Sequence, residues 1–114
     1  MRVSYLGPKG SFTQIALMKY FGEDLDQVSQ KNIEDVFKSV ELNDSDYGIV
    51  PIENSIEGSV NNTHDLLIAS DIQIYDEIQM RIHQCLISKT SDINQIEKVY
   101  SHPQSFGQCQ RWLK

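Results

Sequence analysis

Apolar and polar residues follow two different periods along the first part of the chain, and the two periods alternate. Short apolar runs bounded by turn residues are typical of strands, whereas apolar residues three and four apart are typical of helices. Strands are expected over residues 3–6, 27–30 and 46–52. Helices are expected over residues 11–21, 33–40 and 61–69. Strands that alternate with helices predict a mostly parallel sheet with helices on its faces, so the expected fold class is α/β.

Four residues mark the ends of these elements. Ser11 and Asn32 precede the first two helices and carry side-chain oxygens that cap a helix N-terminus. Gly22 follows the first helix at a position where glycine commonly ends a helix. Pro51 cannot donate to a sheet ladder, so it is expected near the end of the third strand.

The second half of the chain has a strand period of its own. From Ile72 to Ile87 apolar residues alternate with polar residues, which predicts one long extended strand. Residues 96–100 are expected to form the next strand. Pro103 is expected in the first turn of a helix, where proline is tolerated.

Composition narrows the possible partners and the expected location. Sixteen acidic and ten basic residues give a formal net charge of −6, which disfavours nucleic acids and anionic membranes as partners. The sequence contains neither a signal peptide nor an apolar stretch of membrane-spanning length, so a cytoplasmic location is expected. The two cysteines form no CxxC pair and the three histidines have no ligand spacing, so neither a metal site nor a disulfide is expected.

Polar residues follow the third expected strand directly and form the first candidate site. Glu53, Asn54, Ser55 and Glu57 come after the apolar run, in what should be a loop. In open α/β sheets ligands bind outside the carboxyl ends of the strands, so these side chains occupy the expected place for substrate contacts. The alternative is an ordinary polar connection with a turn at Glu57 and Gly58.

Three segments carry a resemblance to a known family. They are residues 7–12 (GPKGSF), residues 51–55 (PIENS) and residues 101–109 (SHPQSFGQC). In this order and spacing they resemble the prephenate dehydratase family, whose catalytic domain has a Gly-Pro-x-Gly-[Ser/Thr]-Phe loop, a Pro-Ile-Glu-Asn-Ser segment and a His-Pro-Gln…Gln-Cys segment. The resemblance covers the chain from Met1 to Lys114.

The resemblance implies a two-lobed fold similar to that of type II periplasmic binding proteins, here incomplete. Residues 1–71 would form lobe one, and residues 72–114 would form the crossover and the start of lobe two. The family's Thr-Arg-Phe motif, whose threonine is thought to be the catalytic acid, does not occur in the sequence, and there is no room for the ACT domain that commonly follows. The chain is therefore expected to be a partial catalytic domain. Its uncovered apolar surface is expected to favour a homo-oligomer.

The activity implied by the resemblance is the conversion of prephenate to phenylpyruvate, carbon dioxide and water, a step of L-phenylalanine biosynthesis. The reaction needs two carboxylates held in place and an acid that protonates the departing hydroxide, so neither a metal nor an organic cofactor is expected. Because the acid threonine is not in this chain, the 114 residues would supply the binding and polarising half of the site and would be inactive alone.

Four residues match catalytic positions of the family motifs: Glu53, Asn54, Ser101 and Gln108. Asn54 can donate and accept hydrogen bonds and is suited to hold a hydroxyl or a carboxylate. Glu53 would either act protonated or orient neighbouring donors, because a second negative charge beside a dianionic substrate is unfavourable. Ser101 and Gln108 are expected at the mouth and in the first turns of a helix whose free N–H groups favour an anion.

Six further residues are expected to bind the substrate: Gly10, Ser11, Thr13, Ser55, His102 and Gln104. Gly10, Ser11 and Thr13 open the first helix and would cradle a carboxylate with backbone N–H groups. The alternative is simple capping by Ser11 with a solvent-facing Thr13. His102 would either contact the substrate or only anchor its loop.

Three other functions remain open. The two-lobed fold also serves solute capture, so one alternative is a non-catalytic module that binds small carboxylates. A second is an arogenate dehydratase, because arogenate differs from prephenate by an amino group in place of a keto oxygen. A third is a structural or dimerisation fragment without activity.

Overall fold

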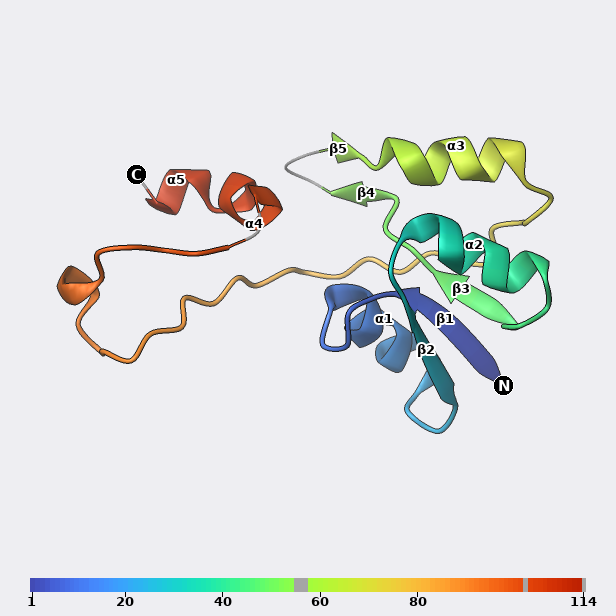
Figure 1. Cartoon of the computed structure of the whole chain (residues 1–114), viewed down its shortest axis with the longest axis horizontal. Coiled ribbons are helices and arrows are strands. Elements are labelled where there is room, and N and C mark those ends of the chain that lie inside the picture. The colour runs from blue at the N-terminus through green and yellow to red at the C-terminus, as the bar shows by residue number, and fades with distance from the viewer. Residues whose placement is uncertain (55–57, 102, 114) are drawn as a thin grey trace.

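A three-stranded parallel sheet forms the centre of the N-terminal half of the chain (Figure 1). The computed structural model describes residues 1–54, 58–101 and 103–113. Within the sheet the strand order is β2-β1-β3. The strands are β1 (Arg2–Leu6), β2 (Asp26–Gln30) and β3 (Tyr47–Ile49). The expected α/β class with a parallel sheet is therefore confirmed.

Two helices, α1 (Phe12–Phe21) and α2 (Ile33–Glu41), connect these strands and pack on the sheet. The side chains of Ser11 and Asn32 each accept a hydrogen bond from the backbone N–H three residues further on, so both expected N-caps are confirmed. Gly22 ends α1 with a φ of 83°, a left-handed conformation that favours glycine.

Alternate residues of the central strand β1 face opposite sides of the sheet. Val3 and Tyr5 are fully buried against Leu17 of α1. Ser4 is fully buried on the α2 side, where its Oγ lies 2.9 Å from that of Ser39 and 2.5 Å from that of Ser45. The Ser39 and Ser45 hydroxyls also bond to each other, at 2.7 Å. One face of β1 is therefore apolar, and the other is closed by three hydroxyl groups that bond to one another.

Strand β3 is shorter than expected and ends at Ile49. The chain turns there into a hairpin, because the Ile52 carbonyl accepts a hydrogen bond from the Val60 N–H at 2.8 Å and does not pair with β1. Strand β4 (Glu53–Asn54) then pairs antiparallel with β5 (Gly58–Ser59). The segment expected to be a polar loop therefore contains a short ladder. Helix α3 (Asn61–Ala69) follows over the expected residues.

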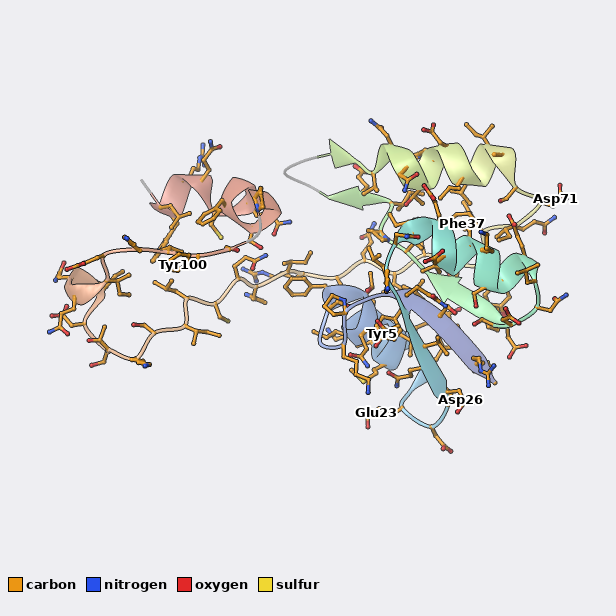
Figure 2. All side chains as sticks on the ribbon, in the orientation of Figure 1. Tyr5, Glu23, Asp26, Phe37, Asp71 and Tyr100 are labelled. Atoms are coloured by element: carbon orange, nitrogen blue, oxygen red, sulfur yellow. The ribbon has the colours of Figure 1, made fainter. Side chains whose placement is uncertain are left out.

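Residues 72–100 do not form the two strands that their sequence pattern predicted. Within the described residues no strand pairs with them, and they run as an extended segment with one 3-10 turn, η1 (Ile93–Gln95). Ile87 and Tyr100 are 91% and 86% exposed, and Figure 2 shows Tyr100 far from Tyr5 of the sheet. An alternating pattern gives a strand only where a neighbouring strand supplies the ladder hydrogen bonds, which is why the prediction was wrong.

This extended segment makes the molecule elongated. The radius of gyration of the α-carbons is 16.4 Å, whereas a compact domain of this length has about 13 Å. Helices α4 (Pro103–Gln108) and α5 (Gln110–Leu113) follow this segment. Figure 1 shows the chain turning back at η1, so that both helices lie between η1 and the N-terminal half. In the described parts of the chain they contact each other but no element of the N-terminal half. None of the described helices has the length and apolar character needed to cross a membrane.

Candidate functional site

Two of the three expected site segments leave the sheet at the same edge. Strands β1 and β3 are parallel and paired, with Tyr5 opposite Ile49, so their carboxyl ends lie side by side. Residues 7–11 follow β1 and residues 50–54 follow β3. This edge is where ligands bind in open parallel sheets.

The loop after β1 depends on two glycines. The Gly7 N–H donates to the Gln30 carbonyl at 2.8 Å, and a Cβ at Gly7 would lie 1.9 Å from Ser29 Oγ. A side chain fits there only if the Ser29 hydroxyl rotates away and the Gln30 carbonyl, 3.2 Å from that Cβ, shifts by a few tenths of an ångström. Gly10 has a φ of 84°, in the left-handed region that favours glycine. These two positions fix how the loop passes from β1 to α1.

The hydroxyls of Ser11 and Thr13 bond to the protein's own backbone. Both donate to the Leu6 carbonyl, Ser11 Oγ at 3.0 Å, so Thr13 is not the solvent-facing residue of the capping alternative. Ser11 Oγ also accepts from the Gln14 N–H, which confirms its capping role. The backbone N–H groups of Phe12 and Thr13 have no acceptor among the described residues. An anion at this helix start would therefore meet backbone N–H groups and not hydroxyl protons.

The N–H of Gly10 already has a partner. It donates to Gln14 Oε1 at 2.6 Å, and Gln14 Nε2 donates to Gln27 Oε1 at 2.8 Å. A carboxylate could use the Gly10 N–H only if this bond opened. Gln14 was missed in the sequence, although Ser-x-x-Gln at a helix start is the signature of a capping box.

The segment after β3 is held by helix α3. Thr63, only 1% exposed, donates from Oγ1 to the Pro51 carbonyl at 2.7 Å. This bond fixes the chain just before Glu53, whose side chain is exposed. Asn54 lies in β4 by its backbone, while its side chain, together with Ser55 and the turn expected at Glu57, falls outside the described residues. Thr63 carried no sequence signal, because its partner is set by how α3 packs.

The described part of the third site segment, in α4, has no contact with this edge of the sheet. Ser101 is exposed, and Pro103 begins α4 as predicted. Gln108 is half-buried and its Oε1 accepts from Gln84 Nε2 at 2.7 Å. His102 and the side chain of Gln104 are outside the described residues. Gln108 therefore lies in an element that has no described contact with the N-terminal half.

Contacts of the residues after α3 attach the start of the extended segment to the sheet. The rings of Tyr47 and Tyr75 have centroids 5.1 Å apart. The Tyr20 hydroxyl donates to Asp76 Oδ2 at 2.7 Å, which raises the pKa of Tyr20 to about 12 and lowers the pKa of the Asp76 carboxyl. Because the two pKa values move in opposite directions, the hydrogen bond favours neutral Tyr20 beside ionised Asp76.

The described residues contain no cluster of three His, Cys, Asp or Glu side chains that could hold a metal ion, and Cys85 and Cys109 are unpaired. A hollow of about 260 Å³ lies between α2 and strands β1 and β2, and its border runs from Arg2 to Gln30.

Comparison with known proteins identifies the family. A family model described as prephenate dehydratase matches residues 3–114. The chain belongs to the prephenate dehydratase family. The resemblance of the three sequence segments is therefore confirmed.

Individual relatives agree with this family. The chain is 44% identical over 114 residues to the bifunctional chorismate mutase/prephenate dehydratase of Aquifex aeolicus (strain VF5), covering 100% of the chain and 32% of that protein. It is 42% identical over 114 residues to the protein of the same description from Stutzerimonas stutzeri, covering 99% and 31%. The chain thus spans about a third of the length of these relatives.

Solved structures of the family share the fold of part of the chain. The prephenate dehydratase of Streptococcus mutans is 44% identical with a TM-score of 0.58, over 60% of this chain and 35% of that chain. The prephenate dehydratase of Arthrobacter aurescens, in complex with L-Phe, is 33% identical with a TM-score of 0.56, over 62% of this chain and 24% of that chain.

Proposed function

We propose that residues 1–114 are part of a prephenate dehydratase that converts prephenate to phenylpyruvate, carbon dioxide and water in L-phenylalanine biosynthesis. The observation that carries this proposal is the common edge of β1 and β3, from which the family's Gly-Pro-x-Gly-Ser-Phe loop and Pro-Ile-Glu-Asn-Ser segment both emerge. Two segments that are distant in sequence thus reach one place, as a shared binding site requires.

In the proposed reaction the protein has two tasks, to position the substrate and to transfer a proton. Loss of carbon dioxide and hydroxide makes the substrate ring aromatic, so the site must hold two carboxylates and help the hydroxide leave. The Phe12 and Thr13 N–H groups are suited to one carboxylate, since they lie at a helix start and have no described acceptor. Asn54 would hold the hydroxyl or the second carboxylate, and Glu53 would orient neighbouring donors.

The remaining site residues belong to a second lobe in this proposal. Residues 1–71 form lobe one of a fold similar to type II periplasmic binding proteins, and residues 72–114 form the crossover and the start of lobe two. The absence of described contacts between α4 and the N-terminal half supports this division. Ser101, His102, Gln104 and Gln108 would meet the substrate from lobe two and complete the site.

The surface of the chain bears on the oligomeric state and the partners of the proposed enzyme. The extended segment exposes apolar side chains such as Ile74, Ile87 and Tyr100, which supports a homo-oligomer. The net charge of −6 supports an enzyme that does not bind nucleic acid, and we place this enzyme in the cytoplasm. The reaction needs neither a metal nor an organic cofactor.

The test is phenylpyruvate formation from prephenate, with arogenate as a parallel substrate, by the full-length protein in which residues 1–114 occur. We expect turnover of prephenate, and Asn54→Ala should lower kcat without lowering the melting temperature. Gln73→Ala, at an exposed position away from the site, serves as the matched control. Binding of prephenate without product would favour the carboxylate-binding module, and turnover of arogenate alone would make the protein an arogenate dehydratase.

A further inference from the structure

We propose that Gln14 and Gln27 act as a positioning pair that fixes the loop before α1 for binding of the anionic substrate. The inference rests on the proposed function and adds two residues that none of the three family segments contains. It depends on a chain of two hydrogen bonds that runs from the loop through a helix to a strand.

The first bond differs from an ordinary helix cap. Gln14 is the third residue of α1, and in a capping box its side chain would accept from the N–H of the N-cap residue. Here the Ser11 N–H already donates to the Pro8 carbonyl at 3.1 Å. Gln14 Oε1 therefore reaches one residue further and accepts from the Gly10 N–H at 2.6 Å. The bond restrains the left-handed glycine of the loop, not only the helix end.

Capping of the helix does not require the second bond, which joins Gln14 to Gln27. A cap needs only the Gln14 carbonyl, whereas Gln14 Nε2 also donates to Gln27 Oε1 of β2 at 2.8 Å. Both side chains are half-buried, so the pair is partly shielded from water. Gln27 lies opposite Val3 in the ladder, which makes β2 a rigid support for the Gln14 amide. The orientation of that amide, and with it the Gly10 N–H, is set by the sheet.

The pair has two consequences for an anion at this helix start. With the Gly10 N–H held by Gln14, the Phe12 and Thr13 N–H groups are left as the donors of the helix start. The amide of Gln14 also satisfies this loop without adding negative charge, whereas a glutamate would repel a carboxylate nearby. A neutral side chain that both accepts and donates is what this position needs, which is why glutamine fits it.

The test compares variants in the full-length protein by KM and kcat for prephenate and by melting temperature. Gln27→Ala removes only the outer bond and should raise KM about fivefold, with kcat and melting temperature little changed. Gln27→Glu keeps an acceptor for Gln14 and adds its charge one side chain further from the anion, so KM should rise less than in Gln14→Glu. Gln14→Glu keeps the cap but adds charge, so KM should rise by about tenfold or more while the melting temperature holds. Gln73→Ala is the control and should change nothing.

Each result decides for or against the pair. The proposal would be overturned if the wild-type protein turns over prephenate and the KM values of Gln27→Ala and Gln14→Glu both lie within about twofold of the wild-type KM. A lower melting temperature in these variants with an unchanged KM would also overturn it, because that pattern belongs to a purely structural cap. A wild-type protein that does not turn over prephenate would instead contradict the proposed function, and this inference would fall with it.

Discussion

Replacing Thr63 by valine isolates the bond that holds the Glu53–Asn54 strand against α3. Valine has nearly the same shape as threonine, so Thr63→Val leaves no cavity and removes only the hydroxyl that donates to the Pro51 carbonyl at 2.7 Å. A net hydrogen bond contributes about 1 kcal/mol, and an unsatisfied buried acceptor costs about 1–3 kcal/mol. Because Pro51 is only half-buried, water satisfies part of its carbonyl, and we expect a loss of about 1–2 kcal/mol in the free energy of unfolding.

This loss is measurable by heat or by urea. At about 2.1 cal/mol/K per residue, a chain of 114 residues has an unfolding entropy of roughly 0.24 kcal/mol/K, so the melting temperature should fall by about 4–8 °C. The urea midpoint should fall without a change in m. Thr63→Ser is the matched variant, because it keeps the hydroxyl and loses one methyl group. In the full-length protein, we expect the turnover of prephenate to fall in Thr63→Val and to be kept in Thr63→Ser. A valine variant as stable and as active as wild type would refute the role given to this bond.

Three further predictions follow from individual contacts. Gly48→Ala would place a Cβ 2.8 Å from a methyl group of α2. In a urea titration it should lower the free energy of unfolding by about 1–3 kcal/mol. An unchanged midpoint would mean that α2 moves away from the new methyl group without cost. The Tyr20–Asp76 bond stabilises the folded protein fully between pH 3.8 and pH 10.0, the ordinary pKa values of the two groups. This stability is lost as the pH falls through the lowered pKa of Asp76, and also as the pH rises through the raised pKa of Tyr20 at about 12. An NMR titration should show the pKa of Tyr20 returning toward 10.0 in Asp76→Asn, and no return would contradict the assigned cause. Gln108→Ala should lower turnover by at least about tenfold with an unchanged melting temperature, and a matching loss of stability would assign Gln108 a structural role.

Local patterns were enough to predict β1, β2 and the three helices of the N-terminal half, but not the early end of β3 or the β4–β5 hairpin. Helix α2 follows from apolar residues on one face after Asn32, because its cap and its periodicity are both short-range properties. The candidate edge could also be predicted, since alternating strands and helices give parallel strands that end at the same edge. That β1 and β3 are neighbours depends on the strand order β2-β1-β3, which the alternation does not fix. The close approach of Gly7 to Ser29 could not be predicted, because it depends on where β2 lies.

The missed features all depend on partners distant in sequence. Residues 72–100 have a strand pattern, but a pattern cannot supply the neighbouring strand that a ladder needs. The capping signal of Gln14 was present in the sequence, whereas its bond to Gln27 required the position of β2. Thr63 lies in a predicted helix, and its hydroxyl gained a role only because α3 packs beside Pro51.

The measurement that tests the central claim most directly is phenylpyruvate formation from prephenate by the 114-residue chain and by the full-length protein in which it occurs, side by side. The account predicts product from the full-length protein and none from residues 1–114 alone, because the family's acid threonine is not among them. Absence of product from the full-length protein would contradict the assignment of this chain to a working prephenate dehydratase.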